Sequence, residues 1–324
     1  MTSSGIASPI ERDDAFDELD TVAVIVVTYN SGHDVLASLR SVQRSTRRNK
    51  HVVVVDNNST DGIPDLIVTE FPDAKLIRVA QNVGFATAAN IGMAATSTPY
   101  VLVLNPDTVI TPGAVDSLIG FAAAHPTVGV IAPLLLFPDG RNQGTARRFP
   151  TAAAGVFGRR SPVTRLFPNN RWSSRFLSGR DMKPGDPPFQ CDWVSGACML
   201  VPRSAIDAVG MFDTRYFLFW EDADWCARMA AQGFEVWTVP EAVVVHSEGG
   251  SRRGWPTPVV KHFHRGAYLY WKTHSAPQWW NPFRWAAAGL LIARAALISL
   301  PNSKLFTTAR SVGLVTGPTP ETTR

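Results

Sequence analysis

Residues 22–30 of this 324-residue chain read VAVIVVTYN, an apolar and largely β-branched run that ends in three polar residues. A strand buried on both faces of a parallel sheet has this composition, because helices cover both sides of such a sheet. A turn at Ser31 or Gly32 follows, and then a helix whose apolar stripe consists of Val35, Leu36, Leu39 and Val42. Strand, turn and helix therefore form the first unit of an α/β fold.

The same kind of unit recurs further along the chain. Buried strands are predicted at residues 52–55, 75–79 and 100–104, with a helix of small residues before the last of them. A helix near residues 112–124 and a strand near 128–132 come next. This alternation predicts a mostly parallel sheet flanked by helices.

The pattern changes in the second half of the chain. Residues 134–190 are rich in Pro, Gly, Arg and Asn and are too many for an idle loop, so we expect a substrate-recognition segment or lid. Order returns at residues 191–201. A helix at 221–232 and strands at 235–239 and 243–246 follow.

Length and local composition predict one large domain with two flanking segments. Residues 1–20 are polar and acidic and lack a signal-peptide pattern, so we expect a disordered lead-in. Residues 21–275 form the domain, which divides into a nucleotide-binding half (21–133) and an acceptor-binding half (134–275). Residues 276–324 form a C-terminal tail.

The chain is mildly basic, with a formal net charge of +4 and a pI near 9.1. Its basic residues occur in separate clusters, so nucleic acid is not indicated as a partner. A substrate that bears phosphates, or an anionic membrane surface, explains the same excess of basic residues.

Three cysteines without CxxC spacing indicate neither a disulfide framework nor a zinc cluster, and they fit a reducing cytosol. The pattern leaves the oligomeric state open.

The tail contains an apolar stretch, residues 285–300, that is interrupted by Arg294 and preceded by Trp279, Trp280 and Phe283. Its length of about 16 residues is below the roughly 20 that span a bilayer. An amphipathic helix at a membrane interface is the preferred interpretation. A helix packed on the core and a membrane span are the alternatives.

Polar residues follow each of the first three predicted strands. They are Thr28, Tyr29 and Asn30 after the first, Asp56 and Asn58 after the second, and Asn82 and Gly84 after the third. The carboxyl ends of parallel strands meet at one edge of the sheet, where a doubly wound fold binds its ligand. An Asx turn or a tight helix entry explains any one of them without a ligand. The repetition therefore carries the prediction of a nucleotide site.

The fourth predicted strand ends in Asn105-Pro106-Asp107, which puts a carboxylate at the same edge. One such Asp suffices for Mg²⁺ or Mn²⁺ when a diphosphate supplies further oxygens. His246 ends the last predicted strand, and imidazole is a common ligand of Mn²⁺. A plain turn and a histidine with ordinary hydrogen bonds are the alternatives, so only the combination points to a metal site.

Three carboxylates, Glu221, Asp222 and Asp224, stand within four positions at the start of a predicted helix. The helix dipole tolerates negative charge there, and capping explains one or two of them. Aromatic neighbours such as Trp220 and Trp225 would desolvate one carboxylate and raise its pKa, as a general base near neutral pH requires. Asp222 is the candidate base, and the other two are expected to orient it or to cap the helix.

Five motifs, in this order along the chain, resemble the inverting family 2 glycosyltransferases of the GT-A fold. They are VVTYN at 26–30, VDNNSTDG at 55–62, NVGFA at 82–86, NPD at 105–107 and WEDAD at 220–224. The resemblance covers residues 22–270 in outline. It implies that the first strand end and Asp56 hold the nucleotide of a sugar donor, that Asp107 binds a divalent metal, and that Asp222 is the base.

Asn105 stands where the family usually has the first Asp of an Asp-x-Asp motif, which looks like the rhamnosyltransferase and galactofuranosyltransferase branch. That branch implies His246 as a second metal ligand. Residues 193–197, WVSGA, resemble part of the acceptor pocket. The acceptor-binding residues so implied are Trp193, Ser195, Gly196, Trp220 and Glu221.

The resemblance implies an enzyme that moves a sugar from a nucleotide diphosphate to a hydroxyl with inversion. It favours dTDP-rhamnose as the donor, with UDP-sugars next, and a cell-envelope polysaccharide or polyprenyl-diphosphate-linked glycan as the acceptor, at the cytoplasmic face of the cell membrane. Arg252, Arg253 or Arg265 would add positive charge at the leaving diphosphate. A non-catalytic carbohydrate-binding or scaffold protein is the alternative. The first strand is followed by neither the GxGxxG of an NAD enzyme nor the basic Gly-rich loop of a nucleotidyltransferase.

Overall fold

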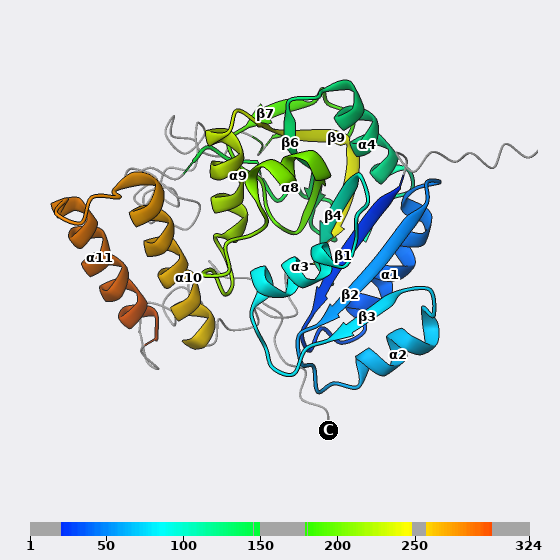
Figure 1. Ribbon diagram of the computed structural model, residues 1–324, viewed down its shortest axis with the longest axis horizontal. Helices are drawn as coiled ribbons and strands as arrows, with labels where there is room; N and C mark the ends of the chain where they lie inside the picture. The colour runs from blue at the N-terminus through cyan, green and yellow to red at the C-terminus, as the bar shows by residue number, and fades with distance from the viewer. Residues whose placement is uncertain (1–20, 145, 150–178, 180, 248–256, 300–324) are drawn as a thin grey trace, which may run out of the picture.

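The structure is a computed structural model that describes residues 21–144, 146–149, 179, 181–247 and 257–299 (Figure 1). The expected lead-in at 1–20, most of the expected recognition segment 134–190 (145, 150–178 and 180), and the tail beyond Ser299 lie outside the described residues. Arg252 and Arg253 lie outside them as well.

A single nine-stranded sheet runs through the described part of the chain, in the order β3-β2-β1-β4-β8-β6-β9-β5, with β7 paired to β9. The first four strands of this order are β1 (Val22–Thr28), β2 (Lys50–Asp56), β3 (Lys75–Arg78) and β4 (Tyr100–Leu104). The others are β5 (Thr108–Ile110), β6 (Val128–Leu136), β7 (Phe189–Cys191), β8 (Cys198–Pro202) and β9 (Glu235–His246).

The expectation of a mostly parallel sheet holds for only part of it. Strands β3, β2, β1 and β4 are parallel, as the alternating strand and helix pattern predicts. Strand β8, however, runs antiparallel to β4 and β6, and β9 runs antiparallel to β5 and β7. The sheet is therefore mixed, because strands from the second half of the chain enter it in the opposite direction.

Helices cover both faces of the sheet. In the described residues before α10, these helices are α1 (Asp34–Ser45), α2 (Ile63–Glu70), α3 (Phe85–Ala94), α4 (Ala114–Ala124), α8 (Arg203–Val209) and α9 (Glu221–Ala231). The residues of β1 point alternately to two cores, one with α3, α8 and α9 and the other with α1, α2 and α4. Every residue of β1 is buried, as its continuous apolar sequence predicts.

Strands β6 and β9 are longer than the sequence pattern suggests. The two strands expected at 235–239 and 243–246 form one strand, β9, in which pairing with β6 passes from Val239 directly to Val243. Strand β6 likewise continues beyond residue 134, where the regular pattern ends in the sequence. The irregularity falls at Pro133 of β6 and opposite Pro240 of β9, where proline interrupts the ladder without ending the strands.

The C-terminal part of the described chain is a helical hairpin beside α9 (Figure 1). It consists of α10 (Thr257–Tyr270), the π-helical turn η2 (Trp271–Ser275) and α11 (Pro282–Ser299). Helix α11 packs on α10, where Arg284 Nε donates to the Tyr268 hydroxyl over 3.4 Å and Arg294 Nη1 lies 3.3 Å from His264 Nε2.

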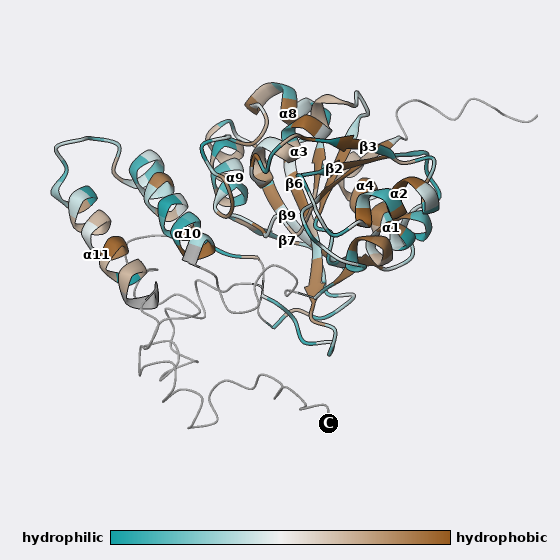
Figure 2. Ribbon diagram, turned by 90° about the horizontal axis from the view of Figure 1, so that it is seen from below, coloured by the Kyte–Doolittle hydropathy of each residue, from teal (hydrophilic) through white to brown (hydrophobic). Residues whose placement is uncertain are grey.

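The hairpin leaves large apolar side chains in the open. Trp279, Trp280, Phe283 and Trp285 are exposed, and so are Leu290 and Ile292 further along α11. Figure 2 shows α11 at the outer edge of the molecule, with hydrophobic residues among hydrophilic ones along α10 and α11. None of the helices in the described part of the chain is long and apolar enough to cross a membrane.

Candidate active site

The ends of β1, β2 and β4 lie at one edge of the sheet. Thr28 pairs with Asp56, and Val26 pairs with Leu104, directly before Asn105. We call the loops that follow β1, β2 and β3, residues 29–33, 57–62 and 79–84, the donor edge. The predicted donor residues thus come together where the sequence places them, at the carboxyl ends of parallel strands.

Side chains join the loops of the donor edge to one another. The backbone N–H of Asn30 donates to Ser59 Oγ over 3.0 Å, and Asn30 Oδ1 accepts the backbone N–H of Thr60 over 2.8 Å. Asp61 Oδ2 accepts the backbone N–H of Gly32 over 3.1 Å. The loop after β1 is therefore held to the loop after β2 by three separate hydrogen bonds.

The predicted donor residues differ in how open they are to a ligand. Tyr29, Asn30 and Asn58 are exposed, and both asparagines have positive φ, a conformation that asparagine tolerates better than most residues. Thr28 is buried, and its hydroxyl donates to Ser31 Oγ. Asp56 is buried too, and its Oδ1 accepts the backbone N–H of Ser59 over 3.0 Å. This bond reaches the N–H three residues on, not the second residue on as in the Asx turn considered as the alternative, and nucleotide binding by Asp56 stays a prediction.

Asn82 and Gly84 hold the third loop in place. Asn82 Oδ1 accepts from Asn57 Nδ2 over 2.9 Å and from the backbone N–H of Gly84 over 3.0 Å. Gly84 has φ +84°, and a Cβ on it would lie 2.5 Å from the backbone oxygen of Phe217. Phe85 donates its backbone N–H to that same oxygen over 2.7 Å. Gly84 thus provides a close contact with the loop before α9, and its role toward a nucleotide stays a prediction.

Asp107 and His246 meet because of the short strand β5, which the sequence pattern does not reveal. Thr108 pairs with His246 in the antiparallel ladder between β5 and β9. Ser247 donates its backbone N–H to the backbone oxygen of Asp107 over 3.0 Å. His246 Nε2 consequently lies 3.2 Å from Asp107 Oδ1. The structure brings the two predicted metal ligands together.

Gln143 orients the His246 ring from the other side. Its Nε2 donates to the His246 backbone oxygen over 2.6 Å, which turns its Oε1 toward His246 Nδ1 at 3.0 Å. With its amide N–H committed to the His246 backbone, Gln143 presents Oε1 as an acceptor for an Nδ1–H, a tautomer in which Nε2 can bind a metal. At metal sites the second ring nitrogen of a ligating imidazole usually donates to an oxygen acceptor, and Gln143 Oε1 offers one here.

A carboxylate and an imidazole with an outer partner fit a divalent cation that takes its other ligands from a diphosphate and water. Within the described residues, no group of three or more His, Cys, Asp or Glu side chains could hold a metal by itself. The two candidate ligands, Asp107 and His246, are therefore suited to a cation that binds together with the substrate of the protein.

The turn at 195–197 joins the Asp107 turn to Asp222. Asn105 donates its backbone N–H to the Ala197 oxygen over 2.9 Å, and Gly196 donates its own to Asp222 Oδ2 over 3.0 Å. A Cβ on Gly196 would lie 3.4 Å from Asp222 Cβ, so the backbone approaches the carboxylate closely. Two acidic clusters more than a hundred residues apart in sequence thereby belong to one site.

Asp222 has the electrostatic surroundings expected of a base. Burial raises the pKa of its carboxyl above the ordinary range of aspartate, and the N–H groups of Gly196 and Ala223 and the charge of Arg147 partly oppose that rise. This direction is the one expected for Asp222, and its role as a base stays a prediction. A raised pKa makes a carboxylate a stronger proton acceptor near neutral pH.

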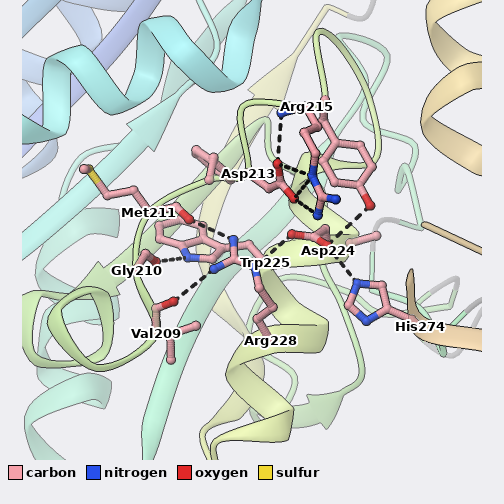
Figure 3. A network of polar contacts seen from close by, with 12 residues as sticks. Val209, Gly210, Met211, Asp213, Arg215, Asp224, Trp225, Arg228 and His274 are labelled. Atoms are coloured by element: carbon pink, nitrogen blue, oxygen red, sulfur yellow. Dashed lines mark hydrogen bonds and ion pairs between the residues drawn. The ribbon is translucent and has the colours of Figure 1, made fainter. Parts of the chain in front are cut away.

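Asp224, two residues further along α9, has a different role from the one expected. It is 1% exposed, and it accepts from Tyr216 Oη over 3.3 Å and from Arg228 Nε over 2.9 Å, with His274 Nε2 at 2.7 Å (Figure 3). Helix α9 has no side-chain cap. Of the two roles expected for Asp224, orienting Asp222 or capping the helix, no side-chain cap hydrogen bond is present, and its carboxylate turns inward to bind the hairpin through η2.

The same network ties α9 to the chain that precedes it. Arg228 donates through Nη1 and Nη2 to the backbone oxygens of Val209 and Met211, and Trp225 Nε1 donates to the Gly210 oxygen over 2.8 Å (Figure 3). Asp213 binds Arg215 beside them. The helix that carries Asp222 is thus held along its first two turns by the preceding segment and by η2.

The five predicted acceptor residues divide into two groups. Ser195 and Gly196 belong to the turn that contacts Asp222. Trp193 is 8% exposed, with Nε1 bonded to the Arg148 oxygen and Arg147 over its ring. Trp220 packs on Phe263 and Tyr270 of α10, and Glu221 is buried. Both tryptophan rings make protein contacts, so their part in acceptor binding stays a prediction.

Comparisons with known proteins agree with this geometry. The sequence matches the model of "Glycosyl transferase family 2" over residues 23–207. An N-acetylglucosaminyl-diphospho-decaprenol L-rhamnosyltransferase of Mycobacterium tuberculosis is 32% identical over 290 residues, 86% of this chain and 93% of that protein. A dTDP-rhamnosyl transferase of Shigella flexneri is 22% identical over 231 residues, 70% of this chain and 69% of that protein.

Similar solved structures include a mannosyltransferase of Pyrobaculum calidifontis in complex with GDP-Man and Mn²⁺. It superposes with a TM-score of 0.53 at 21% identity, over 91% of this chain and 80% of that one. The expected GT-A fold is confirmed by this likeness and by the mixed sheet with its flanking helices.

Proposed function

This chain belongs to glycosyl transferase family 2, and on that premise we propose that it transfers a sugar from a nucleotide diphosphate to a hydroxyl with inversion of configuration. The observation that carries the proposal is the pair of hydrogen bonds that connects the turn before Asp107 to the Asp222 carboxylate. The backbone of residues 195–197 bonds to Asn105 on one side and to the Asp222 carboxylate on the other. A donor diphosphate near Asp107 and an acceptor hydroxyl near Asp222 would then be neighbours.

In the proposed reaction Asp222 takes the proton of the acceptor hydroxyl. The acceptor oxygen forms its bond to the anomeric carbon from the face opposite the nucleotide, and the bond from that carbon to the diphosphate oxygen breaks. The donor edge and Asn105 hold the nucleotide and diphosphate, and Ser195 and Gly196 border the acceptor. Positioning and a matched base are the contributions that this chain's own residues make.

Asp107 and His246 are the residues that would hold Mg²⁺ or Mn²⁺, with Gln143 fixing the imidazole. When bound, the cation supplies positive charge next to the departing diphosphate. Arg265, on α10, is a further candidate for charge at the leaving group.

For the donor we propose dTDP-rhamnose, since two similar proteins carry rhamnosyltransferase names. For the acceptor we propose a glycan linked to a polyprenyl diphosphate, the class named in the Mycobacterium tuberculosis relative. A UDP-sugar donor and a polysaccharide acceptor are the nearest alternatives within the same family.

An acceptor of that class would be reached at a membrane. We propose that the hairpin of α10 and α11 binds the protein to the cytoplasmic face of that membrane. Residues 257–299 contain no acidic residue and five basic ones, Lys261, Arg265, Lys272, Arg284 and Arg294. Exposed Trp279, Trp280 and Phe283 stand at the turn of the hairpin. Aromatic and basic side chains on one helix are typical of an interfacial anchor.

The deciding experiment is incubation of the protein with a panel of labelled nucleotide sugars, with and without Mn²⁺ or Mg²⁺, and with a membrane lipid extract. We expect transfer from dTDP-rhamnose to lipid in the presence of metal. Transfer from a UDP-sugar alone would replace the proposed donor. The absence of turnover with every donor would support a non-catalytic carbohydrate-binding protein instead.

Membrane association is tested separately by flotation with vesicles that contain anionic lipid. We expect the full chain to float, and a variant with Trp279→Ser and Trp280→Ser to remain largely in solution. Equal flotation of both proteins would refute the hairpin as the anchor.

A further inference from the structure

Two aromatic residues in the left-handed conformation stand directly before the helix that carries Asp222. Phe219 has φ +68° and Trp220 has φ +75°, and α9 begins immediately after Trp220. Bulky side chains rarely adopt positive φ, and such a conformation persists only where the surrounding structure enforces it. The contacts that enforce it therefore also determine where α9 begins, and Asp222 is the second residue of that helix.

Helix α10 supplies contacts to both aromatic residues. The centre of the Phe263 ring lies 5.8 Å from that of Phe219 and 5.6 Å from that of Trp220. The Tyr270 ring lies 5.5 Å from the Trp220 ring. Two successive turns of α10 thus pack on the left-handed pair.

Gly266 stands between Phe263 and Tyr270 in the sequence of α10, and it brings the backbone of the pair close to the helix. A Cβ on Gly266 would lie 2.9 Å from Trp220 Cδ1 and 3.0 Å from the backbone oxygen of Phe219. Glycine is unfavourable in the interior of a helix, so its presence here has a cost. The cost is offset by a close approach that any larger residue would obstruct.

A second contact holds the first turn of α9 from η2. His274 Nε2 lies 2.7 Å from Oδ1 of the buried Asp224, and the backbone N–H of Asp224 donates to the Trp220 oxygen over 2.9 Å. Helix α10 and η2 therefore contact α9 on both sides of Asp222 in the sequence.

The position of Asp222 matters because its carboxylate meets a second element at close range. Its Oδ2 accepts the backbone N–H of Gly196 over 3.0 Å, and a Cβ on Gly196 would lie 3.4 Å from Asp222 Cβ. A small displacement of the start of α9 would lengthen this hydrogen bond and move the carboxylate away from the turn at 195–197.

We propose that Gly266 is a positioning residue for Asp222: it lets α10 hold Phe219 and Trp220 in the left-handed turn that places the carboxylate against Gly196. This inference rests on the proposed role of Asp222 as the base. It gives α10 a part in the reaction that is separate from contact with a membrane.

The first test places side chains of increasing size at Gly266. Gly266→Ala and Gly266→Val displace the turn, and we expect kcat to fall by about tenfold and about 100-fold, since a misplacement of about 1 Å costs roughly the latter factor. The KM for donor should stay within about twofold, because the interaction lost is one made in the transition state. Steady-state kinetics measure both quantities, and urea unfolding verifies that each variant is folded.

Gly289→Ala and Gly289→Val are the matched controls. Gly289 is an exposed glycine of α11, with no atom within 4 Å of the position that a Cβ would take. The two pairs change helix propensity in the same way, so they differ in the contact alone. We expect wild-type kcat and KM for the controls. An equal loss of kcat in both series, or a raised donor KM with unchanged kcat in the Gly266 series, would overturn the proposal. If Gly266→Val does not fold, the alanine pair decides.

The second test needs no turnover, so it separates this inference from the proposed function. Amide hydrogen exchange of ¹⁵N-labelled protein is followed at Gly196, whose buried N–H reports its bond to Asp222. We expect exchange to be about tenfold faster in Gly266→Ala and unchanged in Gly289→Ala. Equal rates in all three proteins would refute the role of Gly266, whether or not any sugar donor is turned over. Faster exchange with wild-type kcat would uphold the placement and refute Asp222 as the base.

Discussion

The donor edge differs from the surroundings of the two candidate carboxylates, Asp107 and Asp222. At the donor edge, loops after neighbouring parallel strands share several hydrogen bonds: the Asn30 N–H donates to Ser59, the Thr60 N–H donates to Asn30, and Asn57 donates to Asn82. Asp222 accepts the N–H groups of Gly196 and Ala223, and Asp107 faces His246 across one short pair of strands. The donor edge is redundant, whereas each of these carboxylates would take part in the reaction itself.

That difference teaches where substitutions should act most strongly. A loop held by several bonds keeps its shape when one is lost, so effects at the donor edge are expected to be small. A carboxylate that itself takes part in the chemistry, or that carries the metal, has no substitute nearby.

The largest effect is expected for Asp222→Asn. The amide cannot take a proton, so kcat should fall by roughly 10³, within the usual range for loss of a general base. Donor affinity should be unchanged, since Asn keeps the shape and an acceptor for the Gly196 N–H. Steady-state kinetics and donor titration measure the two quantities.

Asp207→Asn on α8 is the control, because Asp207 is exposed and outside the site. Near-normal turnover of Asp222→Asn with normal donor binding would show that Asp222 is not the base.

A second large effect is expected for Asp107→Asn. Loss of an outer partner at a metal site already costs 10- to 100-fold, so loss of a ligand should weaken Mn²⁺ binding by roughly 100-fold or more. Mn²⁺ affinity in the presence of donor can be followed by electron paramagnetic resonance. The exposed Asp139→Asn serves as the control, and unaltered Mn²⁺ affinity would argue against Asp107 as a ligand.

Gly84→Ala tests the contact where the donor edge meets the loop before α9. Its Cβ would have to displace the Phe217 backbone, in addition to the strain of positive φ. We expect a loss of about 3 kcal/mol in the free energy of unfolding, against about 1 kcal/mol for Gly113→Ala. Gly113 has φ +77° and open space around it, so it isolates the strain from the contact. Equal losses in urea unfolding would mean that the Phe217 contact contributes nothing.

The smallest effect is expected for Ser59→Ala. It removes the acceptor of the Asn30 N–H but leaves the bond from Thr60 to Asn30 Oδ1. The free energy of unfolding should fall by about 1 kcal/mol, and the KM for donor should change by less than about threefold. A 100-fold loss of donor affinity would contradict the redundancy of the donor edge.

The parallel half of the fold is predictable from the sequence because its signals are local. Strand β1 is a continuous apolar run, and the apolar stripe of α1 has helical spacing. The helices α2, α8 and α10 are not anticipated; α2 and α8 have only 8 and 7 residues. Strand β5 is missed because three residues are too short for any periodicity to show.

The site is predictable in its residue types but less so in its supporting contacts. Asp107, His246 and Asp222 are identified from chemistry and position, and the structure brings them together. Gln143 and Arg147 lie in the stretch that looks irregular, and their partners are far away in the sequence. No local pattern encodes that His274 would reach Asp224, which the sequence suggests either orients Asp222 or caps the helix.

The three-residue strand β5 also limits how this protein could be re-engineered. Side chains alternate along a strand, so one residue inserted between Asp107 and Thr108 would turn the carboxylate away from His246. Residues 105–110 and the end of β9 must therefore be transplanted together as one module in any chimera. Loop exchanges aimed at donor preference are better confined to the loops after β1 and β2, where altered lengths leave that module intact.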